Sequence, residues 1–241
     1  DEERISLYER IAAAHENLFR KPEKAAESFE KILTIDERHQ PSLKQLERLY
    51  RAQRQWTELV DTYRRHIMAV GESPERQGLY ALMGEVYEVE IKDLDRAIES
   101  YSDILSVDPN QTAALIALGR LYEKVEDWSR AIDTLSHLVS LVSERRQRVE
   151  LHTRIGALYE DRLQDQETAE GRFLEALSTD PNFVPAMLKL IALYKGRGDW
   201  FKAVQLMIRA EEQTANPLEK VKMLYEIGTI YRERLDDEQT S

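Results

Sequence analysis

Cysteine is absent from this sequence of 241 residues, and its absence excludes several kinds of chemistry. Without thiols there is no disulfide framework, no thiolate nucleophile and no cysteine-ligated zinc or iron–sulfur site. Proline and glycine are scarce, with seven and nine residues, so long helices can run without interruption. Runs of β-branched residues are also missing, which argues against a β-sheet. These absences favour an all-α protein.

Long apolar runs and an excess of basic residues are lacking as well. No stretch approaches the ~20 apolar residues that a membrane-spanning helix needs, and residues 1–4 (Asp-Glu-Glu-Arg) do not resemble a signal peptide. The 34 Lys and Arg are outnumbered by 45 Asp and Glu, for a formal net charge of -11. An acidic surface repels phosphate groups, so we expect no nucleic-acid partner and no membrane insertion. A protein or peptide partner fits better, and the compartment, cytoplasm or periplasm, stays open.

The sequence does contain an internal repeat with a 72-residue period. Its clearest markers are the three tryptophans, Trp56, Trp128 and Trp200. Alanines and tyrosines recur at the same interval: Ala25, Ala97 and Ala169, and Tyr50, Tyr122 and Tyr194. Glycines divide each period in two, because Gly84 is followed first by Gly119 and then, after a slightly longer interval, by Gly156. The pattern predicts an alternation of 35-residue and 37-residue half-units.

Each half-unit has helical spacing in two segments that are separated by a short break. Leu115, Leu118 and Leu121 lie on one stripe of the first segment, and the second segment repeats this pattern. Asp127 and Asp199 are placed to cap the second helices. Half-units that begin near 77 and 149 carry one additional residue, so longer turns are expected there.

Small residues in the middle of the helices predict close crossings. Glycine there costs roughly 1 kcal/mol relative to alanine, which is understandable where a second helix passes close by. The glycines are Gly84, Gly119, Gly156 and Gly228, and the small residues expected to face them are Ala97, Ala131, Ala169 and Ala203.

The spacing of these residues resembles the signature of the tetratricopeptide repeat family. Leu118-Gly119 and Tyr122 match its first-helix positions, and Ala131 matches its second helix. The resemblance covers essentially the whole chain, about six and a half repeats, and implies a right-handed α-solenoid of antiparallel helix hairpins. We expect one solenoid domain over 1–241, with repeats at approximately 5–39, 40–76, 77–111, 112–148, 149–183 and 184–220 and a partial repeat at 221–241. Because the register stops in mid-hairpin, a fragment of a longer array is expected.

Motifs for catalysis or cofactor binding are missing. There is no helical histidine pair for a metal, no calcium loop, no glycine-rich phosphate loop and no nucleophile elbow. Paired carboxylates are frequent, as in any acidic helical protein, and carry no specific signal for acid–base chemistry. We therefore predict a protein that is not an enzyme and that has no cofactor and no catalytic or metal site.

The resemblance implies that the first helices line a concave groove. Residues expected on this face include Glu9, Ala13, Glu16, Ala157, Leu188 and Ala192. The charged residues predicted to contact a partner are Lys44, Arg48, Arg51, Glu85, Glu88, Arg120, Lys124, Glu160 and Lys195. Their charges alternate from one half-unit to the next. Either this groove recognises a mixed-charge peptide, with Arg48 and Arg120 contacting carboxylates, or neighbouring helices form salt bridges worth ~0–1 kcal/mol each.

The leading functional hypothesis is a scaffold or adaptor for protein–protein interaction that binds a peptide or protein segment in the groove. The first alternative is a self-assembling oligomerisation module that stacks through exposed repeat ends. In that case the incomplete C-terminal hairpin offers an apolar edge of Leu224, Ile227, Ile230 and Tyr231. The second alternative is an accessory domain of a larger enzyme. Divergence of surface residues between the copies favours a natural, bacterial protein.

Overall fold

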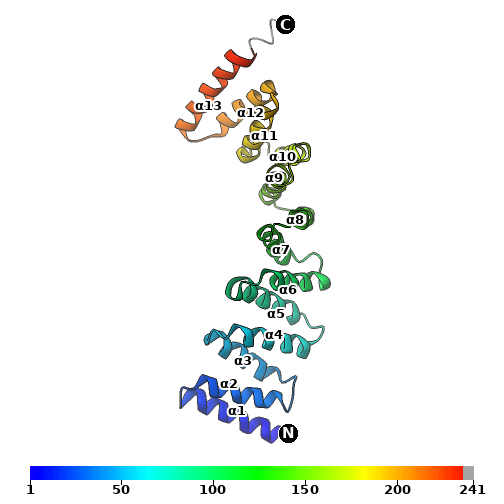
Figure 1. Ribbon diagram of the computed structural model, residues 1–241, viewed down its shortest axis with the longest axis vertical. Coiled ribbons are helices and arrows are strands. Elements are labelled where there is room, and N and C mark those ends of the chain that lie inside the picture. The colour runs from blue at the N-terminus through cyan, green and yellow to red at the C-terminus, as the bar shows by residue number, and fades with distance from the viewer. Residues whose placement is uncertain (236–241) are drawn as a thin grey trace. The chain divides into compact units, whose positions relative to one another are not determined.

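The computed structural model describes residues 1–235, and over this range the chain is helical without any strand (Figure 1). The helices are α1 (Glu2–Asn17), α2 (Pro22–Leu33), α3 (Gln40–Ala52), α4 (Trp56–Val70), α5 (Glu75–Glu85), α6 (Leu94–Val107), α7 (Thr112–Lys124), α8 (Trp128–Leu141), α9 (Arg145–Asp161), α10 (Gln166–Thr179), α11 (Val184–Arg197), α12 (Trp200–Gln213) and α13 (Pro217–Ile230). Two π-helical segments, η1 (Val86–Ile91) and η2 (Tyr231–Leu235), continue α5 and α13. The predicted α-solenoid of helix hairpins is confirmed.

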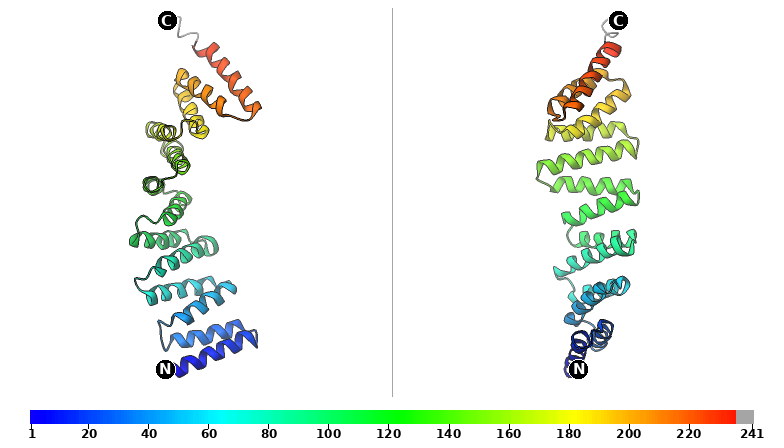
Figure 2. Two further views of the ribbon diagram at one scale, coloured as in Figure 1. Left: turned by 180° about the vertical axis from the view of Figure 1, so that it is seen from behind. Right: turned by 90° about the vertical axis from the view of Figure 1, so that its left-hand side faces the viewer.

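The chain forms two compact units, of which the first is Asp1–Leu121 and the second begins at Tyr122. In the first unit α1 packs against α2, α3 against α4, and α5 against α6. The hairpins are joined by packing of α2 on α3 and of α4 on α5. In the second unit α9 pairs with α10 and α11 with α12, and α13 packs on α12. Both views of Figure 2 show the hairpins of each unit following one another in chain order.

The hydrophobic cores are made by the columns that recur with the 72-residue period. In the first unit Ala25 and Phe29 of α2 pack with Leu43 and Leu46 of α3. In the second unit the equivalents on α10 and α11 form a second core. Ala25, Ala97 and Ala169 are all fully buried, because a methyl side chain lets the two helices of a hairpin approach closely.

One backbone hydrogen bond closes the turn inside each hairpin. The N–H that precedes the second helix donates to a carbonyl oxygen near the end of the first helix. The bond spans six residues in three hairpins: Lys21 to His15, Asp93 to Tyr87 and Asp165 to Tyr159, each 2.9 Å. It spans five in the other three: Gln55 to Tyr50 and Asp127 to Tyr122 at 2.9 Å, and Asp199 to Tyr194 at 2.8 Å. The half-units that begin near 77 and 149 were predicted to carry one additional residue, and this residue therefore lies inside the loop that the hydrogen bond closes. Near 77 it is accommodated as the π-helical segment η1 rather than as a longer turn.

Both predicted residues stand at the N-cap of a second helix, but only one caps through its side chain. Asp127 caps α8, because its carboxylate accepts a hydrogen bond of 3.0 Å from the N–H of Arg130. Asp199 stands at the N-cap of α12, but its side chain makes no capping bond and lies 3.8 Å from the ammonium group of Lys202. Two further aspartates, Asp93 and Asp165, cap α6 and α10.

Close helix crossings are confirmed at two of the predicted glycines. A Cβ atom on Gly84 would lie 2.9 Å from the ring of Tyr101, and one on Gly156 would lie 2.5 Å from the ring of Phe173. The group opposite each glycine is thus an aromatic ring one helical turn beyond the expected alanine. At Gly228 nothing in the described part of the chain lies within 4 Å of such an atom.

Candidate peptide-binding face of the first helices

The first helices α1 and α3 line a cavity of about 590 Å³ in the first unit. Glu9, Ala13 and Glu16 of α1 lie on one side, since positions i, i+4 and i+7 share a helix face. Lys44 and Gln45 of α3 lie on the other side. The structure thus brings together residues from two first helices that the sequence predicted to face a groove.

Arg48 and Arg120, the two predicted carboxylate contacts, are each paired with the preceding first-helix element. Arg48 lies 2.6 Å from a carboxylate oxygen of Glu16 on α1, and Arg120 lies 2.6 Å from Glu88 on η1. The second pair lies one 72-residue period after the first. A hydrogen bond from Arg48 holds the pKa of Glu16 below its ordinary value. The Glu88 side chain is 4% exposed, whereas that of Arg120 is 50% exposed, so the guanidinium group still faces solvent.

The third copy of this pair is built differently. Glu160 takes the position of Glu16 and Glu88, but Ala192 stands where the arginine would be. Lys189, one helical turn earlier on α11, lies 2.8 Å from Glu160 and 3.2 Å from Asp161. Burial lowers the pKa of Lys189, but its bonds to these two carboxylates outweigh burial and raise it. The 72-residue register placed the partner of Glu160 at position 192, so Lys189 was not predicted.

A second set of pairs joins first helices within the second unit, and here the charges are exchanged. Glu123 of α7 accepts a hydrogen bond of 2.7 Å from Arg154 of α9. One 72-residue period later, Lys195 of α11 is paired with Glu226 of α13. Of these four residues the sequence predicted only Lys195. The sequence did contain a signal for these pairs. From one period to the next the charge changes sign at both positions, from Glu123 to Lys195 and from Arg154 to Glu226.

The other predicted residues have different surroundings. Lys44 lies 3.0 Å from Glu75 and holds the pKa of that carboxyl below its ordinary value through their hydrogen bond. Arg51 donates a hydrogen bond to the hydroxyl of the buried Tyr63. Glu85 is exposed and borders a second cavity together with Arg51. Lys124 is exposed in the last turn of α7.

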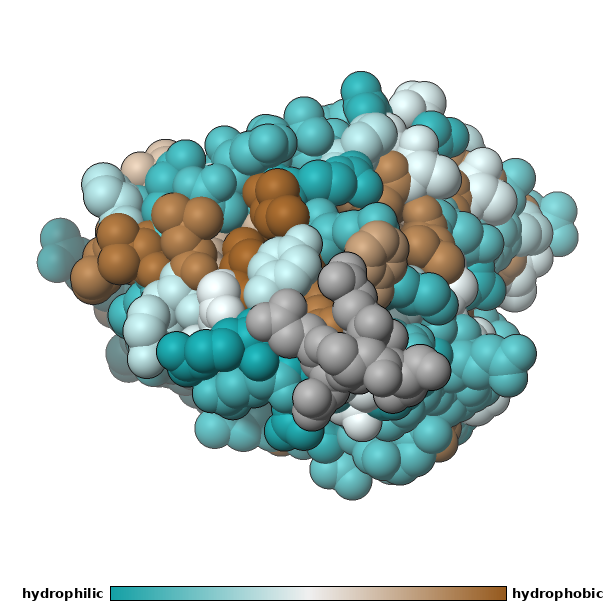
Figure 3. Space-filling view, turned by 90° about the horizontal axis from the view of Figure 1, so that it is seen from above, coloured by the Kyte–Doolittle hydropathy of each residue, from teal (hydrophilic) through white to brown (hydrophobic). Residues whose placement is uncertain are grey.

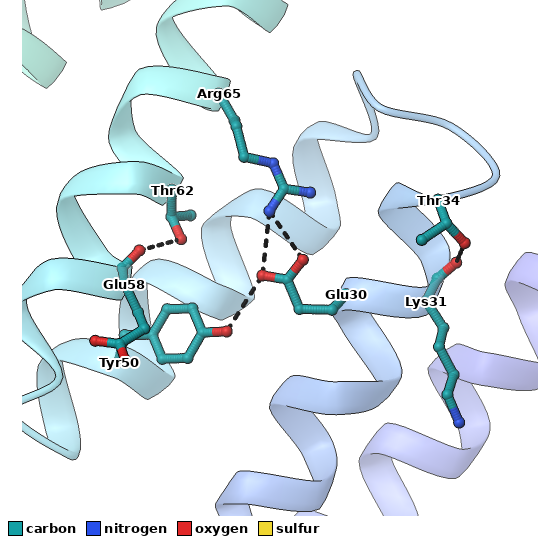
Figure 4. Close-up of polar contacts among 7 residues, drawn as sticks. All are labelled: Glu30, Lys31, Thr34, Tyr50, Glu58, Thr62 and Arg65. Carbon is teal, nitrogen blue, oxygen red and sulfur yellow. Dashed lines mark hydrogen bonds and ion pairs between the residues drawn. The ribbon is translucent and has the colours of Figure 1, made fainter.

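Polar contacts also brace the second helices of the first unit (Figure 4). The carboxylate of Glu30 on α2 accepts hydrogen bonds from the Tyr50 hydroxyl at 3.2 Å and from Arg65 at 2.8 Å. Burial, followed by the charge of Glu30, raises the pKa of Tyr50 well above its ordinary value. Because Tyr50 lies on α3 and Arg65 on α4, this cluster fixes three successive helices.

The carboxylates of Glu16, Glu88 and Glu160 each lie within 3 Å of a cationic side chain, at 2.6, 2.6 and 2.8 Å. Within residues 1–235, no three histidine or carboxylate side chains come together in a way that could hold a metal ion. Over the same range, no helix combines the length and the apolar character that crossing a membrane requires.

Comparison with protein families gives matches across the middle of the chain. Residues 42–77 and 114–149 match one family model described as tetratricopeptide repeat, and residues 78–111 match a second model with the same description. These segments coincide with the predicted half-units at 40–76, 77–111 and 112–148.

Individual relatives are more distant. The general transcriptional corepressor ssn6 of Schizosaccharomyces pombe is 38% identical over 87 residues, which are 36% of this chain and 8% of the corepressor. The structure of Naa15/Naa10 bound to HypK-THB is 18% identical with a TM-score of 0.57, over 98% of this chain and 36% of that one. A tetratricopeptide repeat protein from Parabacteroides merdae is 19% identical with a TM-score of 0.53, over 83% of this chain and 77% of that one. At these identities the two structures show a shared fold only.

Proposed function

Because this chain belongs to the tetratricopeptide repeat family, we propose that it holds an extended polypeptide segment across the face formed by α1 and α3. Membership of the family supports a protein-interaction scaffold in general, and this fold is typically non-enzymatic. Binding of an extended segment, and its position across α1 and α3, is what we propose beyond that general role. It is carried by one observation, the cavity of about 590 Å³ that is lined by residues of two first helices.

The chemistry of this cavity suits a peptide backbone. Exposed amide side chains of Asn17, Gln40 and Gln45 border it, and each amide offers both donors and an acceptor. Glu9 adds an exposed carboxylate, and Ala13 leaves room at the centre of the α1 face. A chain in extended conformation presents N–H and C=O groups in alternation, so such a lining can bind it with little dependence on sequence.

Two half-exposed arginines on other first helices, Arg48 of α3 and Arg120 of α7, offer further donors to a bound segment. Arg48 uses part of its guanidinium group on Glu16 and Gln45, and Arg120 uses part on Glu88. A guanidinium group has five N–H donors. We propose that the remaining donors contact acidic side chains or carbonyl groups of the bound segment.

The proposal is tested by selecting peptides that bind the immobilised chain and measuring their dissociation constants calorimetrically. Ala13→Arg fills the cavity and should weaken binding about tenfold, which corresponds to ~1.4 kcal/mol. Arg48→Glu combined with Arg120→Glu should abolish capture of acidic peptides. Lys24→Glu is the matched control, because it breaks an exposed ion pair on α2, away from this face. Selected peptides that bind Ala13→Arg as tightly as the native chain would refute the proposal.

A second candidate, self-association through α13, is favoured by an exposed apolar face. Val221 of α13 is 62% exposed, although its equivalent in α9, Val149, is fully buried. Leu218, Leu224 and Tyr225 are exposed beside it, whereas Ile227 and Ile230 face inward. Figure 3 views the structure from the side on which Figure 1 draws α13, and it shows hydrophobic side chains at this surface. Light scattering at increasing concentration should show growing mass if two copies pair here, and Val221→Glu should prevent it.

A further inference from the structure

Two of the three tryptophans are each covered by an arginine from the hairpin that follows in the sequence. The guanidinium carbon of Arg162 lies 4.8 Å from the ring centre of Trp128, and that of Arg234 lies 5.2 Å from Trp200. Both pairs lie in the second unit and are related by the 72-residue period. A cation over the face of an indole ring is attracted by the electrons of the ring. The cation is thus a regular part of this position in the repeat.

Trp56 occupies the same position in the first unit, but Glu90 stands where the arginine would be. Within the described residues no cation lies over the Trp56 ring, and instead the ring borders a cavity of about 250 Å³. Glu90 and Glu85 line this cavity, and the exposed Val89 stands at its edge. Trp56 is only half-buried, so its ring is accessible from this space.

A second contact of the repeat is also missing at this place. Glu123–Arg154 and Lys195–Glu226 join first helices in the second unit, but the equivalent residues here are Arg51 and Leu82. Leu82 carries no charge, and the Arg51 side chain is engaged by the hydroxyl of Tyr63. The cavity lies between Arg51 and Leu82, where the other copies have an ion pair.

The charged residues around Trp56 also differ from those around Trp128 and Trp200. Position 90 changes from Arg162 and Arg234 to a carboxylate, and Glu85 replaces the neutral Ala157 and Thr229. No ion pair holds either Glu85 or Glu90 among residues 1–235. At positions 85 and 90 together, the site has lost a cation and gained two anions beside an accessible aromatic ring, while Arg51 places a cation at the rim.

We infer that this cavity binds a cationic side chain, an arginine or a lysine, of the polypeptide that the scaffold holds. The cation occupies the place over Trp56 that Arg162 and Arg234 occupy over their own tryptophans. Glu85 and Glu90 complement its charge, and arginine is preferred because its planar guanidinium group both stacks on a ring and donates to carboxylates. The inference rests on the proposed function and names one feature of the bound segment.

The three indole N–H signals in a ¹H–¹⁵N spectrum provide the test, because Trp128 and Trp200 are internal controls. The probe is acetyl-Gly-Arg-Gly-amide, and the same peptide with citrulline in place of arginine is its uncharged control. The Trp56 signal should shift in a saturable manner with the arginine peptide, while the signals of Trp128 and Trp200 stay in place. No shift at Trp56, or an equal shift with the citrulline peptide, would overturn the inference.

Two variants sharpen the result. Glu90→Arg restores the residue of the other copies and should weaken the probe at least about fivefold by covering Trp56 from within the chain. Arg51→Ala removes a competing cation from the rim and should tighten the probe; weaker binding would show that Arg51 itself contacts the ligand and would count against the inference. Selected peptides that bind at α1 and α3 while the probe leaves Trp56 unmoved would reject this inference alone and leave the proposed function standing.

Discussion

Among residues 1–235, five residues other than glycine adopt a left-handed backbone conformation, and each stands immediately before the N-cap of a second helix. They are Arg20, Arg54, Lys92, Glu126 and Gln164, with φ between 52° and 63°. The sixth hairpin has Gly198, with φ of 80°, at this position. The conformation turns the chain so that the next N–H reaches the carbonyl that closes the hairpin. It costs a residue with a Cβ roughly 1–2 kcal/mol, and glycine does not incur this cost.

Gly198→Ala should therefore lower the free energy of unfolding by roughly 1 kcal/mol. The cause is backbone strain, because the added Cβ would meet only the Trp200 indole nitrogen, at an ordinary 3.8 Å. Gly196→Ala is the matched control, since Gly196 lies in α11 with no atom within 4 Å of an added Cβ. There the higher helix propensity of alanine should stabilise by about 0.5–1 kcal/mol. Urea unfolding followed by circular dichroism measures both, and shifts of equal sign would contradict this account.

The buried polar pair Glu47–His66 is a contact that cannot be predicted from either sequence position alone. Glu47 stands in the column of Gly119, and His66 in that of Leu138. In the structure Nδ1 of His66, whose side chain is almost fully buried, lies 2.5 Å from the Glu47 carboxylate. The sequence shows that each of these two residues departs from the repeat. It does not show that they compensate each other, because they lie on two different helices.

At the scale of helices, the exchanged pairs Glu123–Arg154 and Lys195–Glu226 indicate that within the second unit these columns preserve a contact rather than a particular charge. Both pairs connect successive first helices, and both members are partly exposed. Solvent screening keeps each pair weak, at about 0–1 kcal/mol. Their contribution is therefore to favour the correct neighbour over an incorrect one more than to add stability.

Exchange of the charges tests this interpretation. Glu123→Lys places two cations side by side and should lower the free energy of unfolding by about 0.5–1 kcal/mol. Adding Arg154→Glu recreates the order found in Lys195–Glu226 and should recover most of that loss. Chemical denaturation of the native chain, the single variants and the double variant provides the comparison. If the double variant is as unstable as Glu123→Lys alone, the pair has no role in helix recognition.

The helices and their turns could be predicted from the sequence, because apolar and small residues recur wherever backbones must approach. The candidate site could be predicted only in part. Long polar side chains reach across one helical turn, so Lys189 replaces a partner at position 192 without keeping the register. The π-helical segment η1 was also beyond prediction, since an additional residue can be accommodated in a turn or in a helix.

At the scale of the whole molecule, a solenoid gains its stability from contacts between neighbouring repeats. One domain over residues 1–241 stays a prediction, and the division into compact units at Leu121 and Tyr122 provides a way to test it. Trp56 reports on the first unit, and Trp200 on the second. Variants that retain a single tryptophan, with phenylalanine at the other two positions, can follow each unit separately.

Gly156→Val places a side chain against the ring of the fully buried Phe173 and should destabilise the second unit by roughly 2 kcal/mol through overpacking. Gly228→Val, at the equivalent position of the next period, is the control, because no described atom lies within 4 Å of an added Cβ there. Since repeats interact mainly with their neighbours, Gly156→Val should lower the urea midpoint reported by Trp200 more than the midpoint reported by Trp56. Fluorescence of the single-tryptophan variants measures both midpoints. An equal fall at both tryptophans would mean that the two units unfold as one cooperative domain, as the unbroken 72-residue register alone would predict.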